Sequence, residues 1–63
     1  MKYIVRLKDD NRTANVFYVR QDGLSSFEVV YLENQINRGV HFFNTQYEAV
    51  QSALLYTSEG VMR

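Results

Sequence analysis

The chain has 63 residues without cysteine or proline, and its seven basic residues balance its seven acidic ones. This length allows one domain, over residues 1–63, and the absence of cysteine excludes a disulfide. Apolar runs fall short of the about 18 residues that a membrane span needs, so we expect a small soluble domain in the cytoplasm. A chain this short buries only about 60% of its unfolded surface, and we therefore expect a homodimer to add buried area.

The first two elements read as a β-hairpin. Residues 3–8 alternate and are rich in β-branched and aromatic side chains, which predicts a half-buried strand. Residues 9–15 are polar, and Asp and Asn favour turns. Residues 16–20 predict a second strand, which ends at residues 21–23. Three apolar side chains would share one face of the first strand: Tyr3, Val5 and Leu7.

The next segment combines strand-forming residues with a helix start signal. Its β-branched and aromatic side chains have strand propensity. However, Ser25 stands three residues before Glu28, which is the spacing of a capping box. Arg38 and Gly39 supply a positive charge and a left-handed stop of the kind that ends helices. We predict a helix over residues 26–37.

This helix would carry two apolar arcs at about 100° per residue. One arc consists of Leu24, Phe27, Val30 and Tyr31. The other lies almost opposite and consists of Val29, Leu32 and Ile36. A helix that lies on one small sheet needs a single apolar stripe. The second arc must therefore meet another helix, a dimer mate or a target.

The rest of the chain predicts a strand and a second helix. Residues 40–43 form a short apolar strand, and Thr45 precedes Glu48 by three residues in a second capping box. We predict a helix over residues 46–57 that ends at Gly60. Its apolar stripe would consist of Tyr47, Val50, Ala53 and Leu54. The predicted fold is α+β: a three-stranded, mainly antiparallel sheet with two helices, in the order β-β-α-β-α.

Residues for catalysis or metal binding do not gather in the sequence. Nucleophilic catalysis needs a nucleophile, a base and an orienting group, and His41 is the sole histidine. We interpret His41 as a half-exposed strand residue, and Asp9 and Asp10 as a hairpin turn rather than a cation site. The three glycines do not form a phosphate-binding loop. We expect no catalytic residue, no cofactor and no metal site, and hence a protein that is not an enzyme.

Nucleic-acid binding is the alternative function. The hairpin holds most of the basic residues, and aromatic side chains interleaved with cations on a sheet suit single strands. The cations are Arg6, Lys8, Arg12 and Arg20, and the aromatic residues are Tyr3, Phe17 and Tyr18. The sequence pI of about 6.5 argues against this function, because dedicated binders are strongly basic.

Gly23-Leu24-Ser25 followed by Phe27-Glu28-Val29-Val30-Tyr31 resembles the central motif of the small uracil-DNA glycosylase inhibitors of certain Bacillus phages. The resemblance covers residues 4–34, with Asp9-Asp10 matching the family's acidic turn, Phe17-Tyr18 its aromatic strand and residues 27–31 its helix. It implies a phage protein that acts in the host cytoplasm as a dimer and a DNA mimic, occupying the glycosylase's DNA-binding groove. This chain is neutral, whereas the family is acidic, and it has Val19 at an acidic position.

The resemblance and the apolar arcs together predict a partner-binding group. It consists of Phe27, Glu28, Val30 and Tyr31. The resemblance implies that Phe27 enters an apolar pocket of the enzyme, with Glu28 and Tyr31 as neighbours in the contact. The alternative for Phe27 and Tyr31 is core packing. The predicted function is inhibition of a host protein, with a uracil-DNA glycosylase as the implied target.

Overall fold

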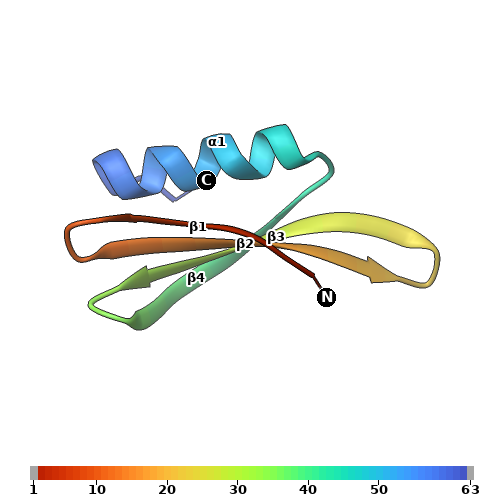
Figure 1. Ribbon diagram of the computed structural model, residues 1–63, viewed down its shortest axis with the longest axis horizontal. Helices are drawn as coiled ribbons and strands as arrows, with labels where there is room; N and C mark the ends of the chain where they lie inside the picture. The colour runs from red at the N-terminus through yellow and green to blue at the C-terminus, as the bar shows by residue number, and fades with distance from the viewer. Residues whose placement is uncertain (1, 63) are drawn as a thin grey trace.

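The computed structural model describes residues 2–62 and consists of one antiparallel sheet crossed by one helix (Figure 1). The strands follow one another in space as they do in sequence, in the order β1-β2-β3-β4. The elements are β1 (Lys2–Asp9), β2 (Arg12–Gln21), β3 (Leu24–Glu33), β4 (Ile36–Phe43) and α1 (Gln46–Glu59).

Tight turns join the four strands. The β2–β3 turn is Asp22–Gly23, with φ of 54° and 76°, and the β3–β4 turn is Asn34–Gln35, with φ of 53° and 67°. Two successive left-handed residues give the turn that matches the twist of a two-residue hairpin, and Asp, Asn and Gly adopt this conformation most readily. The Asn34 amide also donates to the Asn11 carbonyl at 2.8 Å, which ties the β3–β4 turn to the β1–β2 turn.

The predicted order β-β-α-β-α is wrong, because residues 26–37 do not form a helix. They belong to β3, the Asn34–Gln35 turn and the start of β4, so the sheet has four strands and the described chain has one helix. β3 pairs with β2 over its whole length. The Ser25 hydroxyl hydrogen-bonds the Tyr18 hydroxyl across this pair at 2.8 Å, instead of capping a helix. Strand propensity and pairing on both sides therefore override the local capping signal.

The second capping box is confirmed. The Thr45 hydroxyl accepts from the Glu48 amide at 3.2 Å and donates to its carboxylate at 2.8 Å. The Gly60 amide donates to the Tyr56 carbonyl at 2.7 Å, with Gly60 in the left-handed conformation. Half of the predicted stripe is wrong: Ala53 is buried and Val50 half-buried, but Tyr47 is 74% and Leu54 45% exposed. The buried stripe is Ala49, Ser52, Ala53, Tyr56 and Thr57.

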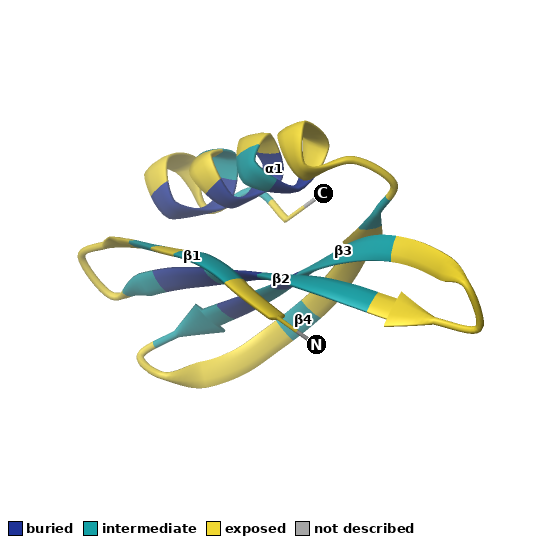
Figure 2. Cartoon of the chain, turned by 45° about the vertical axis from the view of Figure 1, so that its right-hand side comes forward, coloured by how far each residue is buried: buried dark blue, intermediate teal, exposed yellow. Residues whose placement is uncertain are grey.

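The core lies between the sheet and α1 (Figure 2). Its fully or almost fully buried members are Ala14, Val16, Val29, Tyr31, Ala49, Ala53 and Tyr56. The helix contributes two alanines at its contact with the sheet, so its backbone can approach closely. The tyrosine rings of Tyr31 and Tyr56 pack edge to face with centroids 4.9 Å apart. The helix therefore covers one face of the sheet and leaves the other bare.

Candidate functional site

The bare side of the sheet is the main unpartnered surface of the described chain, and we call it the open face. Side chains alternate along a strand, so the positions between core residues point to it. It comprises Tyr3, Arg6, Lys8, Thr13, Asn15, Phe17, Val19, Ser26, Glu28, Val30, Leu32, Val40 and Phe42. Tyr3 joins this face because a register shift between Tyr3 and Val5 breaks the alternation of β1. The prediction that Tyr3 shares a face with Val5 and Leu7 is therefore wrong.

Strand β3 is apolar on both of its sides. Val29 and Tyr31 point to the helix and are 0% exposed. Val30 and Leu32 point the other way and are only half-buried. A near-continuous apolar strand is typical of a sheet that is covered on both faces. In this chain a second covering layer is missing from the described residues.

An aromatic row crosses the middle of the open face. The strand pairings place Tyr3 beside Phe17, Phe17 beside Glu28, and Glu28 beside Phe42. The rings of Tyr3 and Phe17 meet edge to face with centroids 5.7 Å apart. Tyr3 is 53% and Phe42 61% exposed. Glu28 thus lies between two phenylalanines in this row. A partner that covers the row would have to pair the Glu28 carboxylate with a positive charge or leave it hydrated.

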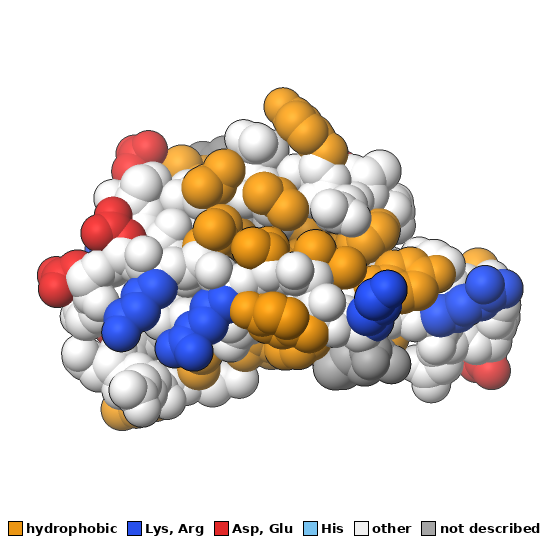
Figure 3. Space-filling model, viewed as in Figure 1, with side chains coloured by type: hydrophobic (Ala, Val, Ile, Leu, Met, Phe, Trp, Pro, Cys, Tyr) orange, Lys and Arg blue, Asp and Glu red, His pale blue; other side chains and the backbone are white. Residues whose placement is uncertain are grey.

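The two ends of the open face differ. The next cross-strand row contains Arg6 and Val40, and the hollow beyond it is polar. That hollow is lined by Arg6, Lys8, Asp10, Asn11, Thr13, Asn34 and Gln35. Figure 3 views the sheet from its β1 edge and shows Lys and Arg side chains along this edge toward both ends of the molecule, with hydrophobic side chains between them.

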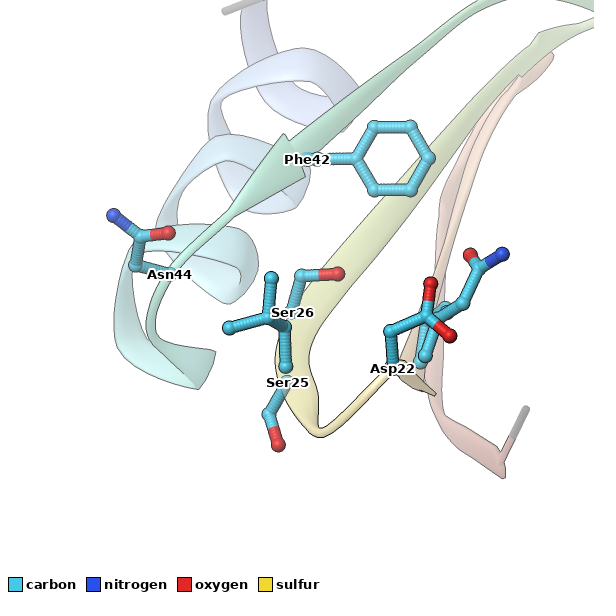
Figure 4. Close-up of a pocket in the computed structure, with 8 residues that line it drawn as sticks. Asp22, Ser25, Ser26, Phe42 and Asn44 are labelled. Carbon is cyan, nitrogen blue, oxygen red and sulfur yellow. The ribbon is translucent and has the colours of Figure 1, made fainter.

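A second hollow lies at the opposite end, next to the β2–β3 turn (Figure 4). Phe42 from β4, Ser26 from β3 and Asp22 from the turn point toward it, whereas the Ser25 hydroxyl points away. Val19 and Leu24 complete its apolar lining, and Leu24 is 76% exposed. The open face therefore runs from a polar, basic end, over an aromatic middle, to an apolar hollow.

The four predicted partner-binding residues are divided between the two faces. Glu28 and Val30 lie on the open face, and Phe27 and Tyr31 lie on the helix side. The Tyr31 hydroxyl hydrogen-bonds the Ser52 hydroxyl, and burial raises the pKa of Tyr31 above its usual 10.0 against a smaller lowering by that bond. Phe27 is half-buried, with its ring centroid 5.5 Å from that of Tyr18. In this structure Tyr31 is a core residue, and partner binding by the other three stays a prediction.

The basic hairpin is divided in the same way. Arg6, Lys8, Tyr3 and Phe17 share the open face, whereas Tyr18 and Arg20 belong to the helix side by register. Arg12 is engaged at the end of α1. Its Nε donates to the Thr57 carbonyl and its Nη2 to the Ser58 carbonyl, both at 3.3 Å. Two of the four predicted cations therefore remain together.

The predicted hairpin turn at Asp9 and Asp10 is confirmed, since Asp9 ends β1 and Asp10 is left-handed with φ of 59°. His41 lies on β4, with its ring 5.5 Å from that of Tyr31, and it is exposed. Residues 2–62 contain no group of three His, Cys, Asp or Glu side chains placed to hold a metal ion. The one described helix is too short and too polar to cross a membrane.

No family model, curated protein or solved structure matches the chain.

Sequence reasoning missed Phe42 and Val40 as members of this surface, and it named Phe17 only for the nucleic-acid alternative. Their nearness to Glu28 and Val30 comes from strand pairing, which a single sequence does not display. One signal was available: the unbroken apolar run of residues 29–32, which is typical of a strand covered on both sides.

Proposed function

We propose that this chain is a non-enzymatic binding protein whose open face is a protein–protein interface. The observation that carries the proposal is the two-sided apolar character of β3, of which only one side is covered. Contiguous exposed apolar surface of this kind marks interaction sites. The broad aromatic row, with exposed Tyr3 and Phe42, supplies the large anchors in which interface hot spots are enriched.

The narrower candidate is inhibition of a host enzyme, with a uracil-DNA glycosylase as the first target to assay. The resemblance over residues 4–34 supports this choice of enzyme, although residues 27–31, which match a helix of that family, form part of β3 here. The contact group would be Glu28 and Val30 with their open-face neighbour Phe42, because Tyr31 is buried. The test is the rate of uracil excision by a purified bacterial enzyme as the chain is added. Stoichiometric inhibition that Phe42→Lys abolishes supports the candidate, and an unchanged rate at micromolar chain refutes it.

The general proposal is tested by photo-crosslinking. A photoreactive amino acid is placed at Val40 on the open face or at Leu54 on the outer side of α1, which are 38% and 45% exposed. We expect discrete protein adducts in bacterial cells that express the Val40 variant and none from the Leu54 control. Equal labelling from both positions, or adducts to nucleic acid alone, would overturn the proposal.

Single-stranded nucleic acid is the second candidate partner of this surface. The Tyr3–Phe17 ring pair and the cations Arg6 and Lys8 share the face, and such side chains stack bases and contact phosphates. The negative charge of Glu28 at the centre of the open face disfavours binding of nucleic acid, whose phosphates are also negative. Fluorescence anisotropy with labelled single-stranded DNA or RNA separates the two candidates. A phosphate binder loses affinity steeply as salt rises, and a protein complex with apolar anchors does not.

A further inference from the structure

We infer that the outer edge of β4 is a strand-addition site, where an extended, apolar segment of a partner protein pairs with the backbone of Val40 and Phe42. In the described sheet β4 has a neighbour on one side, β3. The site differs from the open face, because it combines the backbone edge of β4 with a hollow on the helix side. The inference therefore goes beyond the proposed function and can hold without it.

The strand register shows which backbone groups of β4 point outward. In a two-residue hairpin the residues that flank the turn exchange both hydrogen bonds, and between β2 and β3 these residues are Gln21 and Leu24. Bonded and non-bonded pairs then alternate, so the even-numbered residues of β3 bond to β2 and the odd-numbered ones bond to β4. The residues of β4 that receive those bonds are Gly39, His41 and Phe43. The N–H and C=O groups of Val40 and Phe42 consequently point away from the sheet.

The two edges of the sheet are not equally protected. By the same alternation, the backbone groups of Arg6 and Lys8 face out from β1, and a register shift between Tyr3 and Val5 interrupts that strand. Charged residues and bulges are the usual devices that keep an edge strand from pairing with another chain. The register of β4 has no shift over residues 39–43, and this stretch contains no Lys, Arg, Asp or Glu. The β4 edge is therefore the open one.

An apolar hollow lies on the helix side of β4. It is lined by Phe43 and by five residues of α1: Tyr47, Glu48, Gln51, Ser52 and Leu55. The exposed surface of the hollow is almost entirely apolar. The helix covers β1 more than β4, since β1 packs three half-buried apolar side chains against the core, whereas β4, among the described residues, packs Phe43 alone. This offset of the helix leaves the hollow beside the open edge.

The edge and the hollow together define the chemistry of the partner. Backbone pairing selects an extended strand, and pockets for alternate side chains select its sequence. Side chains of an added strand that lie opposite His41 and Phe43 point to the side of the hollow, and those opposite Val40 and Phe42 meet exposed apolar side chains. A segment that is apolar at consecutive positions satisfies both sides. The β4 strand of a second copy fits less well, because it brings Gly39 and His41 to the side of the hollow.

Selection from a phage-displayed library of short random peptides tests the inference. We expect enriched peptides that share an uninterrupted run of β-branched and aromatic residues without proline. Val40→Pro removes an outward N–H and should weaken their binding about ten-fold, the effect of one hydrogen bond. Arg6→Pro removes an outward N–H from the β1 edge and should leave binding unchanged. Circular dichroism checks that each variant is folded.

The hollow has its own pair of variants. Leu55→Lys places a charge in the hollow and should weaken peptide binding, because the bound segment is apolar there. Leu54→Lys, at a neighbouring position of α1 that does not line the hollow, is the matched control. Equal binding by the two variants would mean that the hollow takes no part, and would overturn the inference.

Hydrogen exchange followed by NMR gives a readout that apolar contact alone does not change. In the free chain, the amides of Val40 and Phe42 should exchange faster than those of Gly39, His41 and Phe43, which bond to β3. An enriched peptide should protect the Val40 and Phe42 amides. Peptides that bind without this protection, or a library that yields no peptide sensitive to Val40→Pro, overturn the inference. A dimer that Val40→Pro converts into a monomer, measured by light scattering, also overturns it, because the added strand is then a second copy.

Discussion

Arg12 on β2 donates from its Nε to the carbonyl oxygen of Thr57, near the end of α1, over a distance of 3.3 Å. The last turn of α1 contains no basic residue of its own. A helix C-terminus carries partial negative charge and unsatisfied carbonyls, and a cation there is stabilising. The sheet therefore supplies the positive charge that the helix lacks, through a contact between two residues that are 45 positions apart in the chain.

We expect Arg12→Gln to lower the free energy of unfolding by about 1 kcal/mol. The shorter neutral side chain loses the favourable charge at the helix end and the bonds to Thr57 and Ser58. Urea denaturation at a fixed chain concentration measures the change. Arg20→Gln is the matched control, because Arg20 lies on the same strand and is exposed. Equal losses for the two variants would mean that the position of the charge is irrelevant.

Gly60→Ala should destabilise the chain by more than Gly23→Ala. Both glycines are left-handed, with φ of 75° and 76°, so both alanines carry a backbone cost of about 1–2 kcal/mol. Only at Gly60 would the new Cβ meet another group, the Arg12 Nη1, at 2.7 Å; at Gly23 nothing lies within 4 Å. The excess loss should disappear when Arg12→Gln is present in both variants. A double-mutant cycle by urea denaturation shows whether it does.

The two capping boxes show what a local pattern decides and what it leaves open. Ser25 and Glu28 have the same spacing as Thr45 and Glu48, yet only the second pair caps a helix. Residues 46–59 include alanines and leucines, which favour helix, whereas residues 27–32 are mostly β-branched and aromatic. The Asn34–Gln35 turn, inside the predicted helix, allows β4 to pair with β3. That pairing is a tertiary choice that the capping spacing cannot report.

The surplus of apolar surface in β3 was predictable, but its division between faces was not. Phe27 and Tyr31 are four residues apart, so they share a face in a helix and in a strand alike. Val30 shares their face in a helix and takes the opposite one in a strand. Predicting a helix instead of a strand therefore kept Phe27 and Tyr31 on one face, as they are in the structure, but placed Val30 on the wrong face. Phe42 and Tyr3 join Val30 and Glu28 through pairings between strands, which no periodicity within one segment reveals.

Tyr31→Ala should cost about 3–5 kcal/mol of stability, which a domain of this size can scarcely lose. The Tyr31 side chain is fully buried against Tyr56 and hydrogen-bonded to Ser52. Val30→Ala, at the next position on the half-buried open face, should cost about 1 kcal/mol in a dilute sample. Thermal unfolding by circular dichroism compares the two variants. A folded Tyr31→Ala chain beside an unfolded Val30→Ala chain would mean that the faces are assigned the wrong way round.

Alkaline pH should unfold the chain through its two buried tyrosines. Desolvation raises the folded-state pKa of Tyr31, and desolvation followed by the nearby Glu33 carboxylate raises that of Tyr56, both from 10.0. The folded state thus holds these protons more tightly than the unfolded state does. Their contribution to stability is complete below about pH 10 and is lost as the pH rises from there through the folded-state pKa values. Urea denaturation at fixed chain concentration, between about pH 8 and about pH 12, should show this decline.

Tyr31→Phe should make the decline of stability with pH shallower. It should also cost about 1 kcal/mol at neutral pH, because the bond to Ser52 is lost. Tyr47→Phe, at an exposed hydroxyl, controls for the removal of any tyrosine. If the curve of Tyr31→Phe runs parallel to that of the wild type, ionisation of Tyr31 plays no part in alkaline unfolding.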